Sequence, residues 1–328
     1  MPDYFDTGFC VRTPSWHGKE LLIPEEERPT TWTEARPLAG LDWDPEQRPV
    51  YEMTGEDEDG NPVYARIENW HRVARSDNGA TLALNRDSHA LVTNGQIGEI
   101  IEAVCGQTSV RYETAGSVEE GRAVWALALL DEPVQIKGDN SLTLPYLAVT
   151  SRHDAGSCAL RATAVRIVCG NTFRAAEMEG GRTGATYSFN HTKNWQQRVS
   201  EARDAVMHAR AEFGEFVEMA NGLIAVPITD RQREIFVQEF IPAPPEGMAS
   251  DRVKANVEKS REAFRALFES PTTVEIKGTA YGLVQAAVEY LDYVRTARTW
   301  ETRLRRTLLT GEPLKARALK LALEVAAS

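Results

Sequence analysis

The sequence has little cysteine, no long apolar run and no cluster of metal ligands. Its four cysteines form no Cys-x-x-Cys pair, and neither they nor the six histidines have the spacing of a zinc site. No stretch approaches the ~18 consecutive apolar residues of a membrane helix. Residues 1–10 lack the basic and apolar regions of a signal peptide. We therefore expect a reduced cytoplasmic protein with no membrane segment and no bound metal.

An excess of basic residues is also absent, which argues at first against a nucleic-acid-binding protein. The 37 Lys and Arg residues face 48 Asp and Glu residues, for a net charge of -11. Residues 1–60, however, hold 15 acidic and 5 basic residues, a net charge of -10, which leaves -1 for the other 268. Residues 151–210 and 291–328 each carry +4. Nucleic acid is therefore not excluded, and the acidic segment is either a solvated face or an arm that covers a basic site.

Short apolar and alternating segments between turn residues predict strands in the first 170 residues. Residues 49–53 and 62–67 flank a polar hairpin loop, and residues 70–74 and 80–84 flank the turn Ser76-Asp77-Asn78-Gly79. Further strands are predicted at 89–93, 110–114, 123–130, 134–137, 142–150 and 157–168. Few helices connect these strands, so the sheet should be mostly antiparallel.

Capping residues and apolar periodicity predict the helices. Thr31 and Glu34 fit a capping box before a helix at about 32–39, Asn94 is placed to cap a helix over 95–105, and Asn171 to cap another. From Trp195 to Leu223, apolar residues recur at alternating spacings of four and three, which predicts a long helix. Thr229 begins one of several further helices.

These patterns predict an α+β fold, with a mostly antiparallel sheet and a few helices, followed by a C-terminal helical region. We divide the chain into an acidic N-terminal segment (1–60), an α+β sheet domain (61–190) and a helical region (191–328). The apolar seam of the long helix either packs within the chain or forms a homo-oligomer contact. The residues of that contact would be Trp195, Val199, Val206, Phe213 and Phe216.

Candidates for catalysis are few. His153 and Asp154 lie in a predicted turn, with Ser151 and Cys169 nearby in sequence, an arrangement that could support nucleophilic catalysis. The chain has no nucleophile elbow and no phosphate-binding loop. We therefore assign no catalytic residue and expect no cofactor, while an enzyme centred on His153, Asp154 and Cys169 is kept as an alternative.

Basic residues near the end of the predicted sheet are candidates for nucleic-acid binding. Together with Trp70, Tyr112, Tyr146, Tyr187 and Trp195 they could form a groove for phosphates and stacked bases. The alternative is that these arginines cover apolar surface or pair with carboxylates. Arg161 and Arg166 also point to opposite faces of a regular strand, so one basic stripe requires a bulge. The candidates are Arg152, His153, Arg161, Arg166, Arg174, Lys193 and Arg198.

Several short motifs occur in a characteristic order along the chain. They are Trp16-His17-Gly18, Val124-Trp125-Ala126, Gly138-Asp139, Tyr146-Leu147, His153-Asp154, Ala159-Leu160-Arg161-Ala162, Arg166-Ile167-Val168-Cys169-Gly170-Asn171-Thr172, Gly278-Thr279-Ala280-Tyr281-Gly282 and Val288-Glu289-Tyr290-Leu291-Asp292-Tyr293. In this combination the chain resembles the uncharacterised phage/plasmid-like protein family, domain of unknown function 932. The usual Ser-His-Asp-Gly-Ser turn of that family is interrupted here by Arg152 and Ala155.

The resemblance implies a protein of phages, prophages or plasmids in a bacterial host cell, without an established reaction. Its layout is also similar to that of phage single-strand annealing proteins, an analogy of fold alone. Our hypothesis is a DNA-binding protein that binds single-stranded DNA and promotes annealing or recombination. The alternative is a protein-binding accessory factor that modulates a host system and binds no nucleic acid. It would use the acidic segment and the helical region.

Overall fold

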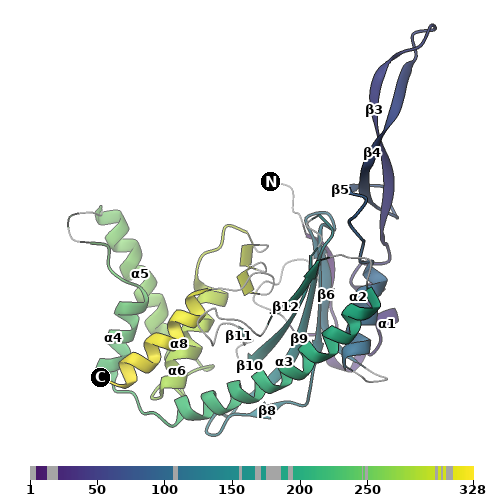
Figure 1. The fold of residues 1–328 in the computed structure, drawn as a ribbon. Coiled ribbons are helices and arrows are strands. Elements are labelled where there is room, and N and C mark those ends of the chain that lie inside the picture. Colours follow the sequence, from purple (N-terminus) through teal and green to yellow (C-terminus); the bar gives the residue numbers. More distant parts are fainter. Residues whose placement is uncertain are drawn as a thin grey trace.

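A nine-stranded sheet forms the centre of the fold (Figure 1). The computed structural model describes residues 5–12, 21–105, 110–154, 157–166, 171–174, 186–190, 195–245, 247, 250–299, 302–303, 306–307 and 313–328. The strand order is β11-β10-β9-β7-β6-β1-β2, with β12 also paired to β10 and β8 to β9. Every pair is antiparallel except β1–β2. The predicted α+β class with a mostly antiparallel sheet is confirmed.

Five strands of this main sheet, β6 to β10, follow the predicted segments, whereas β1, β2, β11 and β12 were not predicted. Their bounds are β1 Phe5–Cys10, β2 Leu21–Leu22, β6 Arg111–Val118, β7 Ala123–Leu129, β8 Val134–Gln135, β9 Leu142–Arg152, β10 Ser157–Arg166, β11 Asn171–Arg174 and β12 Thr186–Asn190. The helix start predicted at Asn171 is wrong, because Asn171–Arg174 form β11; residues 175–185 lie outside the described part of the chain. Asn171 to Arg174 pair with Arg166 to Thr163 of β10, so the sheet and not a helix satisfies their backbone groups.

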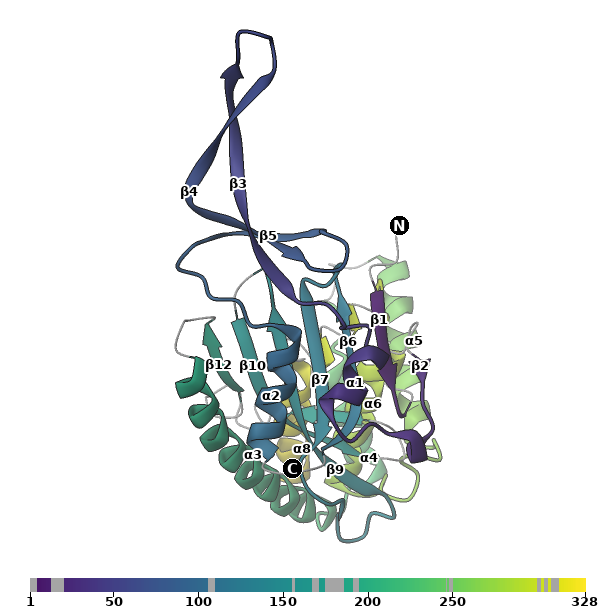
Figure 2. The same ribbon diagram turned by 90° about the vertical axis from the view of Figure 1, so that its right-hand side faces the viewer.

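A second sheet of three strands carries a long hairpin away from the body (Figure 2). It consists of β3 (Pro45–Glu56), β4 (Pro62–Arg75) and β5 (Thr81–Arg86), and we call the β3–β4 hairpin the ribbon. Both predicted hairpins are confirmed, with β4 running through both of them. The strand predicted at residues 89–93 is wrong. The His89 amide donates to the Arg86 carbonyl, and its carbonyl accepts from the Gln47 side chain, so no neighbouring strand pairs with it.

Two helices, α1 (Trp32–Leu38) and α2 (Asn94–Cys105), cover one face of the main sheet (Figure 2). The capping box of α1 is confirmed: Thr31 Oγ1 accepts from the Glu34 amide, and the Glu34 carboxylate accepts from the Thr31 amide. The cap predicted for α2 is wrong by one residue. Thr93 Oγ1 accepts from the Gln96 amide and Gln96 Oε1 accepts from the Thr93 amide, which leaves the Asn94 side chain free to point inward.

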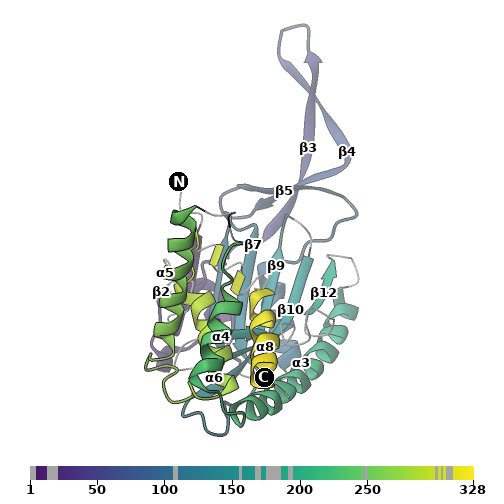
Figure 3. The same ribbon diagram turned by 90° about the vertical axis from the view of Figure 1, so that its left-hand side faces the viewer.

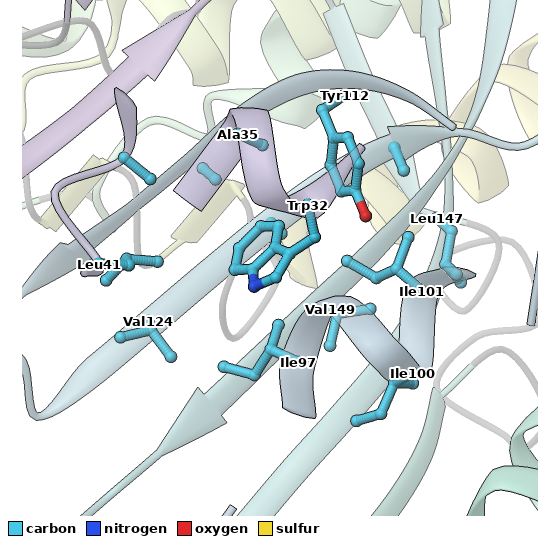
Figure 4. Close-up of a cluster of buried hydrophobic side chains, with 14 of the residues drawn as sticks. Trp32, Ala35, Leu41, Ile97, Ile100, Ile101, Tyr112, Val124, Leu147 and Val149 are labelled. Atoms are coloured by element: carbon cyan, nitrogen blue, oxygen red, sulfur yellow. The ribbon is translucent and has the colours of Figure 1, made fainter. Parts of the chain in front are cut away.

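The first hydrophobic core lies between these helices and the sheet (Figure 4). Trp32 of α1 fills its centre and lies 5.5 Å, centroid to centroid, from the ring of Tyr112 on β6. Gly98 of α2 packs directly against that indole, since a Cβ at this position would lie 1.9 Å from Trp32 Cγ. The two helices can therefore approach this closely only with glycine at the contact.

The long helix α3 (Trp195–Ile224) runs along the body and joins this core to a second one (Figures 1 and 3). Val206 is buried in the first core, and Phe216, Ala220 and Leu223 are buried in the second. The described part of the heptad seam therefore packs within the chain. Phe213 is partly buried against the second core, and the side chains of Trp195 and Val199 lie outside the described part of the chain.

The C-terminal helices form the second core on the other side of the sheet (Figure 3). They are α4 (Asp230–Phe240), α5 (Asp251–Leu267), α6 (Ala280–Glu289), the π-helix η3 (Tyr290–Val294) and α8 (Pro313–Ala326). Rings of Phe236, Phe240, Phe268 and Tyr290 surround Phe264 at centroid distances of 5.2–6.1 Å. The predicted C-terminal helical region is thus confirmed. Among the described residues, no helix combines the length and apolarity needed to cross a bilayer.

The proposed segment boundaries lie within this architecture as follows. Residues 60 and 61 are in the loop between β3 and β4, and residue 190 ends β12. Residues from the 1–60 range contribute β1 and β2 to the main sheet, α1 to the first core, and β3 to the ribbon. The acidic residues are therefore spread over several elements, and the tip of the ribbon carries four in a row, Glu56 to Asp59.

Candidate nucleic-acid interface

His153 lies where the root of the ribbon meets the end of the main sheet. It occupies the turn after β9 and is completely buried. Its amide donates to the Arg122 carbonyl at 2.8 Å, and its ring meets the indole of Trp43 edge-on at a centroid distance of 5.7 Å. Nε2 lies 3.0 Å from Oδ1 of Asn94, the first residue of α2. Three parts of the chain therefore meet at this ring.

The hydrogen bonds of Asn94 fix the protonation of His153. Asn94 Nδ2 donates to the Trp43 carbonyl at 2.8 Å, so Asn94 Oδ1 is the acceptor, and His153 Nε2 carries the hydrogen. His153 Nδ1 is then a bare acceptor, with no hydrogen-bond partner among the described residues. Burial lowers the pKa of His153 to about 4, although the Asp154 carboxylate acts to raise it. The ring is therefore neutral at neutral pH and brings no charge to a phosphate.

Arg152 is held by carboxylates beside this turn. Its Nε donates to Asp154 Oδ1 at 2.9 Å, and its Nη2 donates to Asp154 Oδ2 at 2.6 Å and to Glu119 Oε2 at 2.8 Å. Two negative charges thus compensate one guanidinium. In this arrangement Arg152 has little charge to offer DNA, and His153 is out of reach, so the geometry argues against both as phosphate contacts.

The geometry around His153 also bears on the alternative of an enzyme centred on His153, Asp154 and Cys169. Ser151 is 1% exposed and His153 0%, so a substrate has no access to either. Asp154 binds Arg152, and no hydrogen bond joins it to the His153 ring within the described residues. Cys169 lies outside the described part of the chain. No group of three or more His, Cys, Asp or Glu side chains in the described residues is placed to hold a metal ion.

The other arginines predicted to contact phosphates lie on three different elements. Arg161 and Arg166 lie on β10, Arg174 on β11 and Arg198 on α3, but their side chains are outside the described part of the chain, as is all of Lys193. Their role in binding therefore stays a prediction.

Two of the five aromatic residues of the predicted groove are internal. Tyr112 and Tyr146 are buried in hydrophobic clusters, and Tyr146 donates its hydroxyl hydrogen to Glu113. These two rings are not available to stack on bases, which corrects the prediction for them. Tyr187 and Trp195 have side chains outside the described residues. Trp70 is exposed, and it lies on β4 of the ribbon.

Around Trp70 the ribbon presents a surface that the sequence analysis did not identify. Directly opposed residues of antiparallel strands share a face. The opposed pairs are Tyr51–Arg66, Met53–Tyr64, Trp70–Arg86 and Arg72–Leu84. Their apolar and aromatic members are 36–60% exposed. We call these eight residues the ribbon face.

A shallow groove connects the two halves of the ribbon face. Its volume is about 560 Å³, and it is lined by Pro49, Val50, Tyr51, Tyr64, Arg72 and Leu84. Tyr51 and Tyr64 come from the distal pairs, and Arg72 and Leu84 from the pair near the root. The groove therefore makes the ribbon face continuous.

The arginines of the ribbon face differ from those of the body. Within the described residues, Arg66, Arg72 and Arg86 form no ion pair with a carboxylate, whereas Arg12 and Arg152 each do. The Arg86 guanidinium lies over the Trp70 ring, 5.1 Å from its centroid, and Arg72 donates to Thr81 Oγ1. Positive charge without a carboxylate partner among the described residues thus lies beside exposed rings in both halves of the ribbon face. The sequence carries a signal for its distal half: Tyr51 and Met53, and Tyr64 and Arg66, are two residues apart on strands that flank a polar loop, so each pair shares a strand face.

The sequence profile of one family, described as Domain of unknown function (DUF932), matches residues 81–309. The chain belongs to this family. The match covers more than half of the chain, from β5 through η3, and the ribbon strands β3 and β4 precede it. No curated protein and no solved structure matches the chain. Membership in DUF932 therefore supplies no activity, and the similarity to phage annealing proteins stays a hypothesis.

Proposed function

We propose that this protein binds single-stranded DNA through the ribbon face. The observation that supports the proposal is the alternation of Arg66, Arg72 and Arg86, which lack carboxylate partners among the described residues, with the exposed rings of Tyr51, Tyr64 and Trp70. Guanidinium groups contact phosphates, and aromatic rings stack on bases of any sequence. Unpaired bases are required for this stacking, which favours a single strand over a duplex.

The charge of the ribbon restricts where the DNA strand would lie. The tip residues Glu56 to Asp59 carry four carboxylates, which repel phosphates. The DNA would therefore contact the middle and root of the ribbon.

We place this activity in annealing or recombination of phage or plasmid DNA in the cytoplasm of a bacterial host. A homo-oligomer would use Trp195 and Val199 of the predicted contact, since Val206 and Phe216 are buried within the chain and Phe213 is partly buried. Sedimentation of the protein with and without DNA measures its oligomeric state.

Fluorescence anisotropy with labelled single-stranded and duplex oligonucleotides tests the proposal. The single strand should bind more tightly, and binding should weaken strongly between about 50 and 200 mM salt. Replacing Tyr51 and Tyr64 by alanine should lower affinity about 5- to 150-fold per lost stack. The triple replacement of Arg66, Arg72 and Arg86 by alanine should reduce the slope of log K against log salt by about 2, since each phosphate contact on a single strand contributes about 0.7.

The exposed helix α5 offers a matched control for charge. Arg252→Ala, Lys254→Ala and Lys259→Ala together remove the same three charges away from the ribbon. These replacements should leave the salt slope close to that of the unmodified protein. Equal losses from both triple variants would show that binding follows net charge alone. Absence of binding to either DNA at low salt would refute the proposal.

A second candidate is a protein-binding accessory factor that modulates a host system. The groove favours it, because Pro49, Val50, Tyr51, Tyr64 and Leu84 make its lining largely apolar. Tyr, Trp, Met and Arg, all present on the ribbon face, are enriched in protein interfaces. The acidic tip would then pair with a basic surface of the partner. On this alternative, Glu56→Gln and Glu58→Gln weaken partner binding, whereas on the DNA proposal they leave DNA affinity unchanged or raise it.

A further inference from the structure

Buried polar atoms without hydrogen-bond partners gather at the root of the ribbon. Within the described residues they include His71 Nε2, Asn85 Nδ2 and His153 Nδ1. His71 and Asn85 are opposed across β4 and β5. The charge of His89 acts to lower the pKa of His153, and the charge of His71 acts to lower that of His89. Unpartnered buried polar atoms are rare in folded proteins, and a concentration of them calls for an explanation.

Two sets of contacts fasten the ribbon to the body through this region. In one, Arg36 of α1 donates to the Trp43 carbonyl at 3.1 Å and to the Asp44 carboxylate at 2.9 Å; the other runs through His153. His153 donates from Nε2 to Asn94, and Asn94 donates to the carbonyl of Trp43, two residues before β3 begins. The Trp43 indole packs between the Arg75 guanidinium, 4.2 Å from its centroid, and the turn at Gly121, where a Cβ would lie 2.6 Å from the ring. One of the two sets of contacts at the ribbon root therefore depends on an imidazole with a bare nitrogen.

We propose that His153, Asn94 and Trp43 form a proton-sensitive latch that holds the ribbon on the sheet, closed while the His153 ring is neutral and released when it is protonated. A proton can bind only at Nδ1, which has no acceptor facing it among the described residues. A cation there would be buried and unpaired, which strongly favours an arrangement that lets water reach the ring. This inference concerns how the ribbon is held and does not depend on what the ribbon binds.

The surrounding charges do not offset such a cation. Asp154 favours protonation, but Arg152 binds both of its carboxylate oxygens. His89 opposes it, and burial is the largest effect. Asp87 binds His71, and Asp77 binds Arg75. The titratable and charged groups on the elements around the ring are Arg36, Asp44, His71, Arg75, Asp87, His89, Glu119, Arg122, Arg152 and Asp154, and Arg36 pairs with Asp44.

The sign of the pH effect follows from the two protonation states. The closed latch has a His153 pKa of about 4, and an open latch returns the ring to its ordinary value of 6.5. The open form therefore binds more protons, and the latch is closed above pH 6.5 and weakens as the pH falls from 6.5 to 4. At pH about 5 the ratio of open to closed forms rises about 20-fold over its value at neutral pH.

Hydrogen exchange of the Glu46 and Ala74 amides, which pair across β3 and β4 at the ribbon root, tests the latch after correction for the intrinsic effect of pH. The unmodified protein should show the rise of about 20-fold at pH about 5, while amides of α6 in the second core stay protected. His153→Gln keeps a donor for Asn94 but does not titrate, so its ribbon root should stay protected at both pH values. His153→Phe removes the donor, and its ribbon root should exchange fast even at neutral pH.

Comparison of the unmodified protein with His153→Gln is decisive even if His153→Phe does not fold. The same acid-induced rise in both proteins would assign the effect to carboxylates such as Asp154 and overturn the latch. Simultaneous loss of protection at the ribbon root and in α6 would show global unfolding instead, and would also overturn it. A rise confined to the ribbon root of the unmodified protein supports the proposal.

Discussion

The ion pair between Lys315 and Asp292 in the C-terminal region allows a quantitative test of the second core. Lys315 of α8 is completely buried, and its Nζ lies 2.8 Å from Oδ1 and 3.0 Å from Oδ2 of Asp292 in η3. Asp292 is 2% exposed. Lys315→Met fills a similar volume but leaves the carboxylate buried beside an apolar side chain.

The expected loss follows from the burial of both groups. Breaking a buried ion pair by removing one partner costs about 3–5 kcal/mol, because the remaining buried charge loses that partner. An unfolding entropy of about 2.1 cal/mol/K per residue gives about 0.7 kcal/mol/K for a chain of this length, so Tm should fall by about 4–7 °C. The double variant Lys315→Met with Asp292→Leu removes both charges and should recover most of this loss.

Thermal and urea unfolding, followed by circular dichroism, provide the measurement for all four members of this double-mutant cycle. Lys320 on the same helix is the control: its Nζ lies 3.8 Å from Glu324 and its side chain is 79% exposed, so Lys320→Met should change Tm very little. The reasoning is refuted if Lys315→Met is as mild as Lys320→Met. It is equally refuted if the two single losses at Lys315 and Asp292 simply add in the double variant.

Three further predictions concern the two cores. Gly98→Ala should cost about 1–3 kcal/mol in urea unfolding, because its Cβ would overlap Trp32 and force α1 and α2 apart; Gly222→Ala on α3, with open space around it, should be neutral or stabilise by up to about 1 kcal/mol. Phe264→Ala should cost about 3–5 kcal/mol, since the ring is completely buried among other aromatic rings. Thr31→Ala should lose about 1 kcal/mol with its capping bonds, whereas Thr31→Ser should keep most of that stability; equal losses would contradict the capping role.

Much of the fold could be predicted because its signals are local. The capping box at Thr31 requires only a hydroxyl and a carboxylate three residues apart, and the box at Thr229 and Gln232 is confirmed in the same way. The seam from Trp195 to Leu223 repeats often enough to define a helix by itself. Hairpins follow from turn residues between alternating strands. Each of these features joins residues that are neighbours in sequence.

The wrong predictions arose where distant partners determine local structure. Asn171 has the chemistry of a helix cap, but β10 offers backbone partners, and the segment joins the sheet. Residues 89–93 are apolar enough for a strand but have no strand beside them. Thr93 and Asn94 can both cap a helix, and the choice of Thr93 leaves Asn94 to bridge Trp43 and His153.

The sequence by itself determined the α+β class, the order of most elements and the family, because hydrophobic periodicity, turn residues and motif order are properties of the chain. Only the tertiary structure decided which polar groups are available to a partner. His153 and Arg152 looked suited to phosphate, but burial keeps the first neutral and two carboxylates occupy the second. Arg66 and Tyr64 gained importance because pairing across the ribbon places them on one exposed face. Burial and charge compensation depend on residues far apart in sequence, so no local pattern encodes them.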